Sequence, residues 1–133
     1  MENTKKKILI IDDDEDCLAS AATVLADAGY EVITAPDGQS GLARAVSEQA
    51  DLIILDVMMP KQDGWDTCDE LRALKETHDV PIVFLTCMQP PSSLYASHGA
   101  FDTVWDDYLT KPVTPKTLVS TVEKLLHESS LSH

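Results

Sequence analysis

Residues 51–60 read Asp51-Leu52-Ile53-Ile54-Leu55-Asp56-Val57-Met58-Met59-Pro60. The unbroken apolar run 52–55 is typical of a strand that is covered on both faces in a parallel sheet. Pro60 lacks a backbone donor and disfavours helix for the residue before it, so the chain is expected to turn away there. Asp56 then stands beyond the carboxyl end of a buried strand, where sites gather in open α/β sheets. These residues alone leave two interpretations open for Asp56, a reactive carboxylate or a cap of the following turn.

The rest of the chain alternates between strand-like and helix-like patterns. Further strands are predicted over 8–11, 31–35, 80–85 and 105–110, and the last, being less hydrophobic, is placed at an edge. Apolar residues spaced three and four apart predict helices over 18–28, 42–49, 65–75 and 115–126. Gly29 ends the first helix, Asp37 and Thr114 cap the second and the last, and 129–133 is expected to be a frayed tail. The chain is therefore predicted to be an α/β protein, a doubly wound five-stranded parallel sheet with helices on both faces and an irregular fourth helix in 88–104.

Length and composition bound the class of protein. A chain of 133 residues fits one domain, residues 1–133 with a core of about 6–127. The net charge of −13 argues against nucleic acid as a direct ligand. No apolar run approaches the roughly 20 residues of a membrane span, so no membrane insertion is expected. The three cysteines form no C-x-x-C pair and indicate a reduced, cytoplasmic protein.

Acidic residues follow the first predicted strand in an unbroken row, Asp12 to Asp16. Part of this row suits the N-terminus of the next helix, but five acidic residues exceed what a cap requires, and their repulsion favours a bound cation. A parallel sheet would bring Asp56, Thr86 and Lys111 to the same edge. Oxygen ligands without His or Cys favour Mg²⁺, with Mn²⁺ as an alternative. An aspartate at such a site can accept a phosphoryl group, whose charge Lys and hydroxyl donors stabilise.

Four motifs carry a resemblance to a known family. They are Ile10-Ile11-Asp12-Asp13-Asp14, Leu55-Asp56-Val57-Met58-Met59-Pro60 with Asp63-Gly64, Leu85-Thr86, and Asp107-Tyr108-Leu109-Thr110-Lys111-Pro112. In this order, the motifs resemble the receiver domain of two-component response regulators over residues 6 to about 127. The resemblance implies a flavodoxin-like strand order of 2-1-3-4-5. It also implies a regulator that modifies itself rather than an enzyme acting on other substrates.

The same resemblance implies a role for each site residue. Asp56 would be the phosphoacceptor for a histidine kinase or a histidine phosphotransfer protein. Mg²⁺ would be held by Asp13, Asp56 and the backbone carbonyl of Met58, with Asp12 assisting through water. The phosphoryl oxygens would be bound by Thr86 and Lys111.

A switch is implied as well. Tyr108 would turn inward when Thr86 is drawn to the phosphoryl group, and the surface that partners bind would change. The Lys111–Pro112 bond matches the family's cis peptide.

Three features depart from the family pattern. Cys87 stands where Ala, Gly or Ser is usual, Pro90-Pro91 falls where a fourth helix would begin, and Val104-Trp105 replaces a frequent Gly-Ala pair. These departures lie on the surface that the family uses for output, so the usual partner or dimer mode does not transfer to this chain.

Two other functions remain open from the residues. Asp12-x-Asp14 after a first strand also resembles the nucleophile motif of haloacid-dehalogenase-type phosphatases, with Asp12 attacking and Asp14 as the acid. That interpretation leaves the Asp56 motif without a role. A receiver-like module that binds proteins without being phosphorylated is the second alternative. A flavin-binding flavodoxin is disfavoured because the first loop is acidic, where a phosphate-binding loop needs Ser, Thr and Gly.

The sequence shows no pattern of a DNA-binding or catalytic output domain. We therefore expect the chain to act on a downstream protein target or to pass phosphate along a relay.

Overall fold

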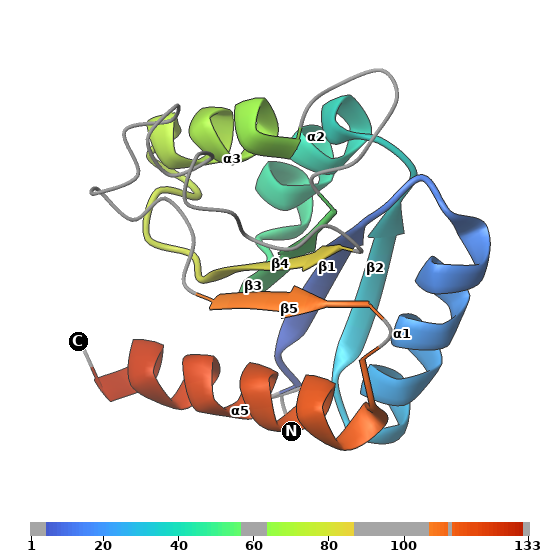
Figure 1. Ribbon diagram of the computed structural model, residues 1–133. Helices are drawn as coiled ribbons and strands as arrows, with labels where there is room; N and C mark the ends of the chain where they lie inside the picture. Colours follow the sequence, from blue (N-terminus) through green and yellow to red (C-terminus); the bar gives the residue numbers. More distant parts are fainter. Residues whose placement is uncertain (1–4, 57–63, 87–106, 112, 132–133) are drawn as a thin grey trace.

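Five strands form one parallel sheet in the computed structural model, which describes residues 5–56, 64–86, 107–111 and 113–131. The strands are β1 (Lys7–Ile11), β2 (Glu31–Ala35), β3 (Leu52–Leu55), β4 (Ile82–Thr86) and β5 (Asp107–Thr110). Their order is β2-β1-β3-β4-β5, which confirms the predicted fold class and places β5 at an edge (Figure 1). Each neighbouring pair is parallel, so all five carboxyl ends lie along one edge of the sheet.

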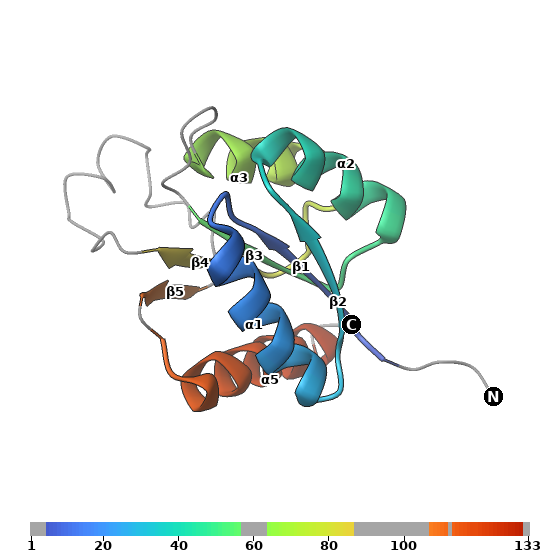
Figure 2. The same cartoon turned by 90° about the vertical axis from the view of Figure 1, so that its right-hand side faces the viewer.

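Helices cover both faces of this sheet. They are α1 (Glu15–Asp27), α2 (Gly38–Glu48), α3 (Gly64–Ala73) and α5 (Pro115–Leu131). The pair α2 and α3 lies on one face and the pair α1 and α5 on the other, as two perpendicular views show (Figures 1 and 2). The irregular fourth helix expected in 88–104 falls outside the described residues.

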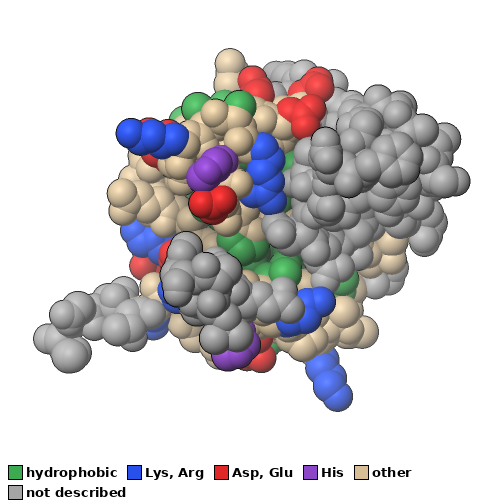
Figure 3. All heavy atoms as spheres, turned by 90° about the vertical axis from the view of Figure 1, so that its left-hand side faces the viewer, with side chains coloured by type: hydrophobic (Ala, Val, Ile, Leu, Met, Phe, Trp, Pro, Cys, Tyr) green, Lys and Arg blue, Asp and Glu red, His purple; other side chains and the backbone are tan. Residues whose placement is uncertain are grey.

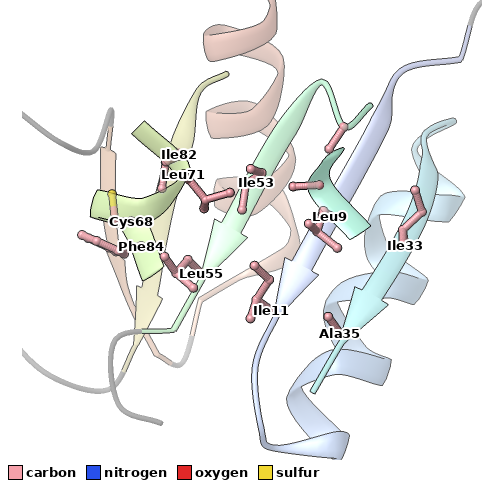
Figure 4. Close-up of a cluster of buried hydrophobic side chains, with 12 residues drawn as sticks. Leu9, Ile11, Ile33, Ala35, Ile53, Leu55, Cys68, Leu71, Ile82 and Phe84 are labelled. Carbon is pink, nitrogen blue, oxygen red and sulfur yellow. The ribbon is translucent and has the colours of Figure 1, made fainter. Parts of the chain in front are cut away.

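The strands alternate their side chains between two cores. In β1, Leu9 and Ile11 face α2 and α3, while Ile8 and Ile10 face α1 and α5. The same alternation separates Ile53 and Leu55 from Leu52 and Ile54 in β3. Figure 4 shows the core on the α2 and α3 side, where side chains of β3 and β4 lie beside Cys68 and Leu71 of α3 and those of β1 and β2 continue the same core away from them. Because both faces are covered, every residue of 8–11 and 52–55 is buried, which explains the unbroken apolar runs.

Most element ends agree with the sequence patterns. Gly29 follows α1 with φ +103°, a conformation that favours glycine and ends the helix. Thr114 caps α5, since its Oγ1 accepts a hydrogen bond from Thr117 N at 3.1 Å. The last helix continues to Leu131, however, so 129–131 is helical rather than frayed. No Gly or Pro follows Leu126 to end the helix earlier.

Several other predicted ends differ from the structure by one to four residues, and three of them have a clear physical cause. Helix α2 ends at Glu48, because Gln49 adopts a left-handed φ of 55° and acts as its C-cap. Helix α3 ends at Ala73 rather than Lys75, because the carbonyl of Leu71 accepts hydrogen bonds from Leu74 N and the Thr77 hydroxyl. Strand β4 begins at Ile82 rather than Val80. Pro81, which has no N–H, precedes it and contributes only its carbonyl to β3.

The cap of α2 gives a first testable prediction. Asp37 Oδ1 accepts hydrogen bonds from Ser40 N and Ser40 Oγ, each at 2.8 Å. Asp37→Ala removes both, and we expect the free energy of unfolding to fall by about 1 kcal/mol in urea denaturation. Asp37→Asn, which keeps the acceptor oxygen, should retain most of the stability. An Ala variant as stable as the parent would show that this cap contributes nothing.

Candidate functional site

Two aspartates stand side by side because their strands are neighbours. Asp12 follows β1 and Asp56 follows β3, and these strands pair directly. Backbone hydrogen bonds fix both residues, since Asp12 N donates to Ala35 O at 3.1 Å and Asp56 N donates to Ile11 O at 3.0 Å. The sheet register thus determines the separation of the two carboxylates.

Three carboxylates converge at this edge. Side-chain oxygens of Asp12, Asp13 and Asp56 all lie within 4.8 Å of one another. Asp12 and Asp56 are 3% and 5% exposed, whereas Asp13 is exposed. Burying two like charges so close together is costly unless cations balance them. The arrangement therefore requires positive charge at this place.

Lys111, the residue after β5, supplies one such charge. Its Nζ lies 2.7 Å from Asp12 Oδ2 and 3.3 Å from Asp56 Oδ2, and its side chain is 18% exposed. Burial would lower the pKa of Lys111, but the hydrogen bond to Asp12 and the charges of Asp56 and Asp12 raise it above its ordinary value. Lys111 is therefore a fixed cation near neutral pH.

The pKa values of the acidic residues differ with their surroundings. Burial raises the pKa of Asp12, and the charge of Asp56 adds to this effect, while Lys111 and the N–H of Asp14 oppose it. Backbone N–H groups of Cys17 and Asp16 hold the pKa of Asp14 below its ordinary range. Asp14 is the N-cap of α1, so this carboxylate of the acidic row is structural.

The donors at this edge fit a hard divalent cation. Lys111 carries one positive charge against the three carboxylates of the cluster, so within this group of described residues negative charge remains in excess. The ligands in the cluster are oxygens without His or Cys, which favours Mg²⁺. The structure brings four predicted site residues together at one edge of the sheet: Asp12, Asp13, Asp56 and Lys111. Their chemical roles remain predictions.

The other predicted site residues are placed only in part. Thr86 ends β4 opposite Thr110, and Tyr108 lies in β5 opposite Phe84. The side chains of Thr86 and Tyr108 lie outside the described part of the structure. The backbone carbonyl of Met58, the Lys111–Pro112 bond and the departures from the family pattern at 87, 90–91 and 104–105 also fall outside it.

Two features around the site could not be read from the sequence. Asp14 N donates to Asp12 Oδ1 at 2.9 Å and so orients the Asp12 carboxylate. Cys17, in the first turn of α1, lines the same cavity as Lys111. The only sequence signal for either feature is that Asp14 and Cys17 stand just after the Asp12-Asp13 pair.

Comparisons with known proteins identify the family of this chain. The family model for the response regulator receiver domain matches residues 8–123. The chain therefore belongs to the receiver domain family of two-component response regulators. It is 40% identical to the probable transcriptional regulator ycf27 of Cyanophora paradoxa, over 97% of this chain and 52% of that protein. It is 39% identical to the alkaline phosphatase synthesis transcriptional regulatory protein PhoP of Bacillus subtilis (strain 168), over 96% of this chain and 51% of that protein.

A solved structure of the Vibrio cholerae chemotaxis protein CheY4 superposes with a TM-score of 0.83 at 33% identity, covering 92% of this chain and 99% of that one. The chain spans about half the length of the curated relatives it matches. Receiver domains typically bind Mg²⁺ at an acidic pocket, and the described residues of this chain include an acidic cluster of that kind.

The phosphatase alternative is not supported by the site. It requires Asp14 to donate a proton as a general acid, yet Asp14 accepts hydrogen bonds from Asp16 N and Cys17 N at the start of α1. Its lowered pKa makes it a poor acid near neutral pH. The receiver family model matches residues 8–123, a range that includes the Asp56 motif.

Proposed function

We propose that this chain accepts a phosphoryl group on Asp56 from a histidine kinase or a histidine phosphotransfer protein and then changes the surface that its partners bind. The observation that carries the proposal is the convergence of the Asp12, Asp13 and Asp56 oxygens within 4.8 Å, with Lys111 bound to Asp12 and Asp56. Membership of the receiver family supports phosphorylation-controlled signalling.

The proposed step is a displacement at phosphorus. A carboxylate oxygen of Asp56 forms the new O–P bond while the P–N bond of the donor phosphohistidine breaks. The imidazole leaves with the electron pair of that bond and takes up a proton. Asp56 then carries an acyl phosphate, and the negative charge at the sheet edge increases.

The residues of this chain would stabilise that charge in two ways. Lys111 Nζ already lies 3.3 Å from Asp56 Oδ2, so its ammonium can hydrogen-bond a phosphoryl oxygen with little movement. Asp13 and Asp56, with the Met58 carbonyl and with Asp12 through water, would hold Mg²⁺. When bound, Mg²⁺ supplies positive charge to the transferring phosphoryl oxygens.

The consequence of phosphorylation is proposed to pass through β4 and β5. Thr86 would bind the phosphoryl group, and Tyr108 would move into the space that Thr86 leaves. These two residues lie on paired strands, since Phe84 and Thr86 of β4 face Tyr108 and Thr110 of β5 in the register. A change at the end of β4 can therefore reach the outer strand directly.

The partners and compartment follow from the same proposal. We place the chain in the cytoplasm, where cysteines such as Cys17 and Cys68, which form no disulfide, stay reduced. Among the described residues, no helix is long and apolar enough to span a membrane.

On the described part of the face in Figure 3, basic side chains are scattered among acidic ones rather than gathered. This distribution and the net charge of −13 favour a protein target over direct binding of nucleic acid.

Acetyl phosphate tests the proposal without a cognate kinase. The parent protein, incubated with acetyl phosphate and Mg²⁺, should gain the mass of one phosphoryl group, and hydroxylamine should remove it because the product is an acyl phosphate. Asp56→Asn and the parent in EDTA should gain none. Asp27→Asn, which removes an exposed carboxylate at the far end of α1, is the matched control and should behave as the parent.

Two outcomes would overturn the proposal. One is a parent protein that gains no mass at any Mg²⁺ concentration. The other is a gain of mass that persists in Asp56→Asn, because the phosphoryl group would then sit elsewhere.

A further inference from the structure

Both oxygens of the Asp12 carboxylate are held by hydrogen bonds. Lys111 Nζ donates to Oδ2 at 2.7 Å, and Asp14 N donates to Oδ1 at 2.9 Å. Asp12 is also fixed at its backbone, because its N–H donates to Ala35 O at 3.1 Å. Rotation of the carboxylate would break bonds that a buried charge needs. Its orientation therefore depends on where the chain places Asp14.

Asp14 is held in turn by the start of α1. Its Oδ1 accepts hydrogen bonds from Asp16 N at 3.0 Å and Cys17 N at 3.4 Å, and its carbonyl accepts one from Leu18 N at 3.0 Å. The two side-chain bonds satisfy N–H groups that have no partner within the helix, which is the function of an N-cap. The cap thus joins the first turn of α1 to the residue that orients Asp12.

Asp13 lies between these two fixed residues. It is exposed, yet one of its side-chain oxygens lies within 4.8 Å of oxygens of Asp12 and Asp56. Like charges this close repel one another, and an exposed side chain relieves the repulsion by moving into water. Because Asp12 is bonded to the sheet and Asp14 to α1, the backbone of Asp13 has little freedom to follow such a movement. The cap therefore opposes the repulsion within the cluster.

We propose that the side chain of Asp14 is a positioning residue for Mg²⁺, which caps α1 and so holds residues 12–14 with both Asp12 and Asp13 turned toward the cation before it binds. The inference rests on the proposed function, in which Asp13 holds Mg²⁺ directly and Asp12 holds it through water. Ligands that are already in place bind more tightly, because less order has to be gained on binding. Asp14 does not contact Mg²⁺ in this role.

Calorimetric titration of Mg²⁺ into the parent and into Asp14→Ala tests the inference without a phosphoryl donor. Alanine has no side-chain oxygen to accept the two cap hydrogen bonds. We expect the dissociation constant for Mg²⁺ to rise about fivefold because the ligands are less well ordered. Asp14→Asn removes the negative charge but keeps an acceptor oxygen, and its dissociation constant should stay within about twofold of the parent's. The difference between Ala and Asn thus separates the cap from the charge.

Two matched variants separate positioning from other causes. Glu15→Ala removes the next carboxylate of the acidic row, which is exposed in the first turn of α1, and should bind Mg²⁺ within about twofold of the parent. Asp37→Ala removes a cap of the same kind from α2, on the opposite face of the sheet (Figure 2). It should lower the urea midpoint about as much as Asp14→Ala does, without changing the dissociation constant for Mg²⁺.

Three results would overturn the inference: Asp14→Ala binds Mg²⁺ as tightly as the parent, Asp14→Asn binds it as weakly as Asp14→Ala, or Asp37→Ala loses the same affinity. In each case the proposed function stands as long as the parent gains a phosphoryl group from acetyl phosphate. A parent that gains none overturns the proposed function whatever its affinity for Mg²⁺, and a parent that binds no Mg²⁺ overturns the inference.

Discussion

Lys111→Met is expected to lower the free energy of unfolding by about 3 kcal/mol at neutral pH without Mg²⁺, because it leaves two buried carboxylates without their cation. Asp12 and Asp56 are 3% and 5% exposed, and Lys111 Nζ is bound to both. Methionine keeps most of the length and apolar stem of lysine, so lost packing contributes little. Urea denaturation in EDTA measures the effect.

The pKa of Lys111 determines the pH at which the stabilities of the parent and Lys111→Met should be compared. That pKa is raised in the folded protein, so the stabilisation by the lysine is fully present below the ordinary value of 10.5. It is lost only as the pH rises through the higher value of the folded state. A comparison at pH 7 therefore measures the whole contribution of the charge.

Two controls identify the cause of the loss. Lys116→Met removes an exposed lysine in the first turn of α5 and should change stability little. Asp56→Asn added to Lys111→Met removes one of the two buried carboxylates that have lost their cation. It should recover part of the lost free energy of unfolding, so the effects of the two substitutions should not be additive. If Lys111→Met and Lys116→Met unfold at the same urea concentration, the buried carboxylates do not depend on Lys111.

The fold was predictable because the strands are covered on both faces. Such strands are unbroken apolar runs, and 8–11 and 52–55 are buried along their whole length. The element ends were less predictable because they depend on single contacts. The Thr77 hydroxyl bonds to the carbonyl of Leu71 at the end of α3, and the spacing of apolar residues contains no trace of that bond.

The site was predictable in part because the strands are parallel. Parallel strands place their carboxyl ends at one edge, so Asp12, Asp56 and Lys111 could be expected together although 99 positions separate Asp12 from Lys111. The hydrogen bond from Asp14 N to Asp12 Oδ1, at 2.9 Å, orients a carboxylate of the site, and it depends on how the chain turns from β1 into α1. No periodicity or motif specifies that distance, so the structure was needed to find it.

The largest packing effect is expected at Gly41, where α2 crosses β1. A Cβ atom at this position would lie 2.4 Å from Ile11 Cδ1, 2.6 Å from Cγ1 and 3.2 Å from Cγ2. Rotation of the outer ethyl group would relieve only the first contact, and Ile11 is completely buried with a stiff χ1. Gly41→Ala is therefore expected to lower the free energy of unfolding by about 2 kcal/mol, although alanine favours helix by up to about 1 kcal/mol.

A second substitution shows whether the collision is the cause. Ile11→Ala deletes all three colliding atoms at a cost of its own, and in that background Gly41→Ala should be neutral or stabilising. Ser47→Gly and Ser47→Ala, compared on the exposed side of α2, give the helix preference without the collision. The collision also affects a residue that positions the site, since Ile11 O accepts the hydrogen bond from Asp56 N. If Gly41→Ala is as destabilising with Ala at position 11 as with Ile, the close approach of α2 to β1 does not explain the glycine.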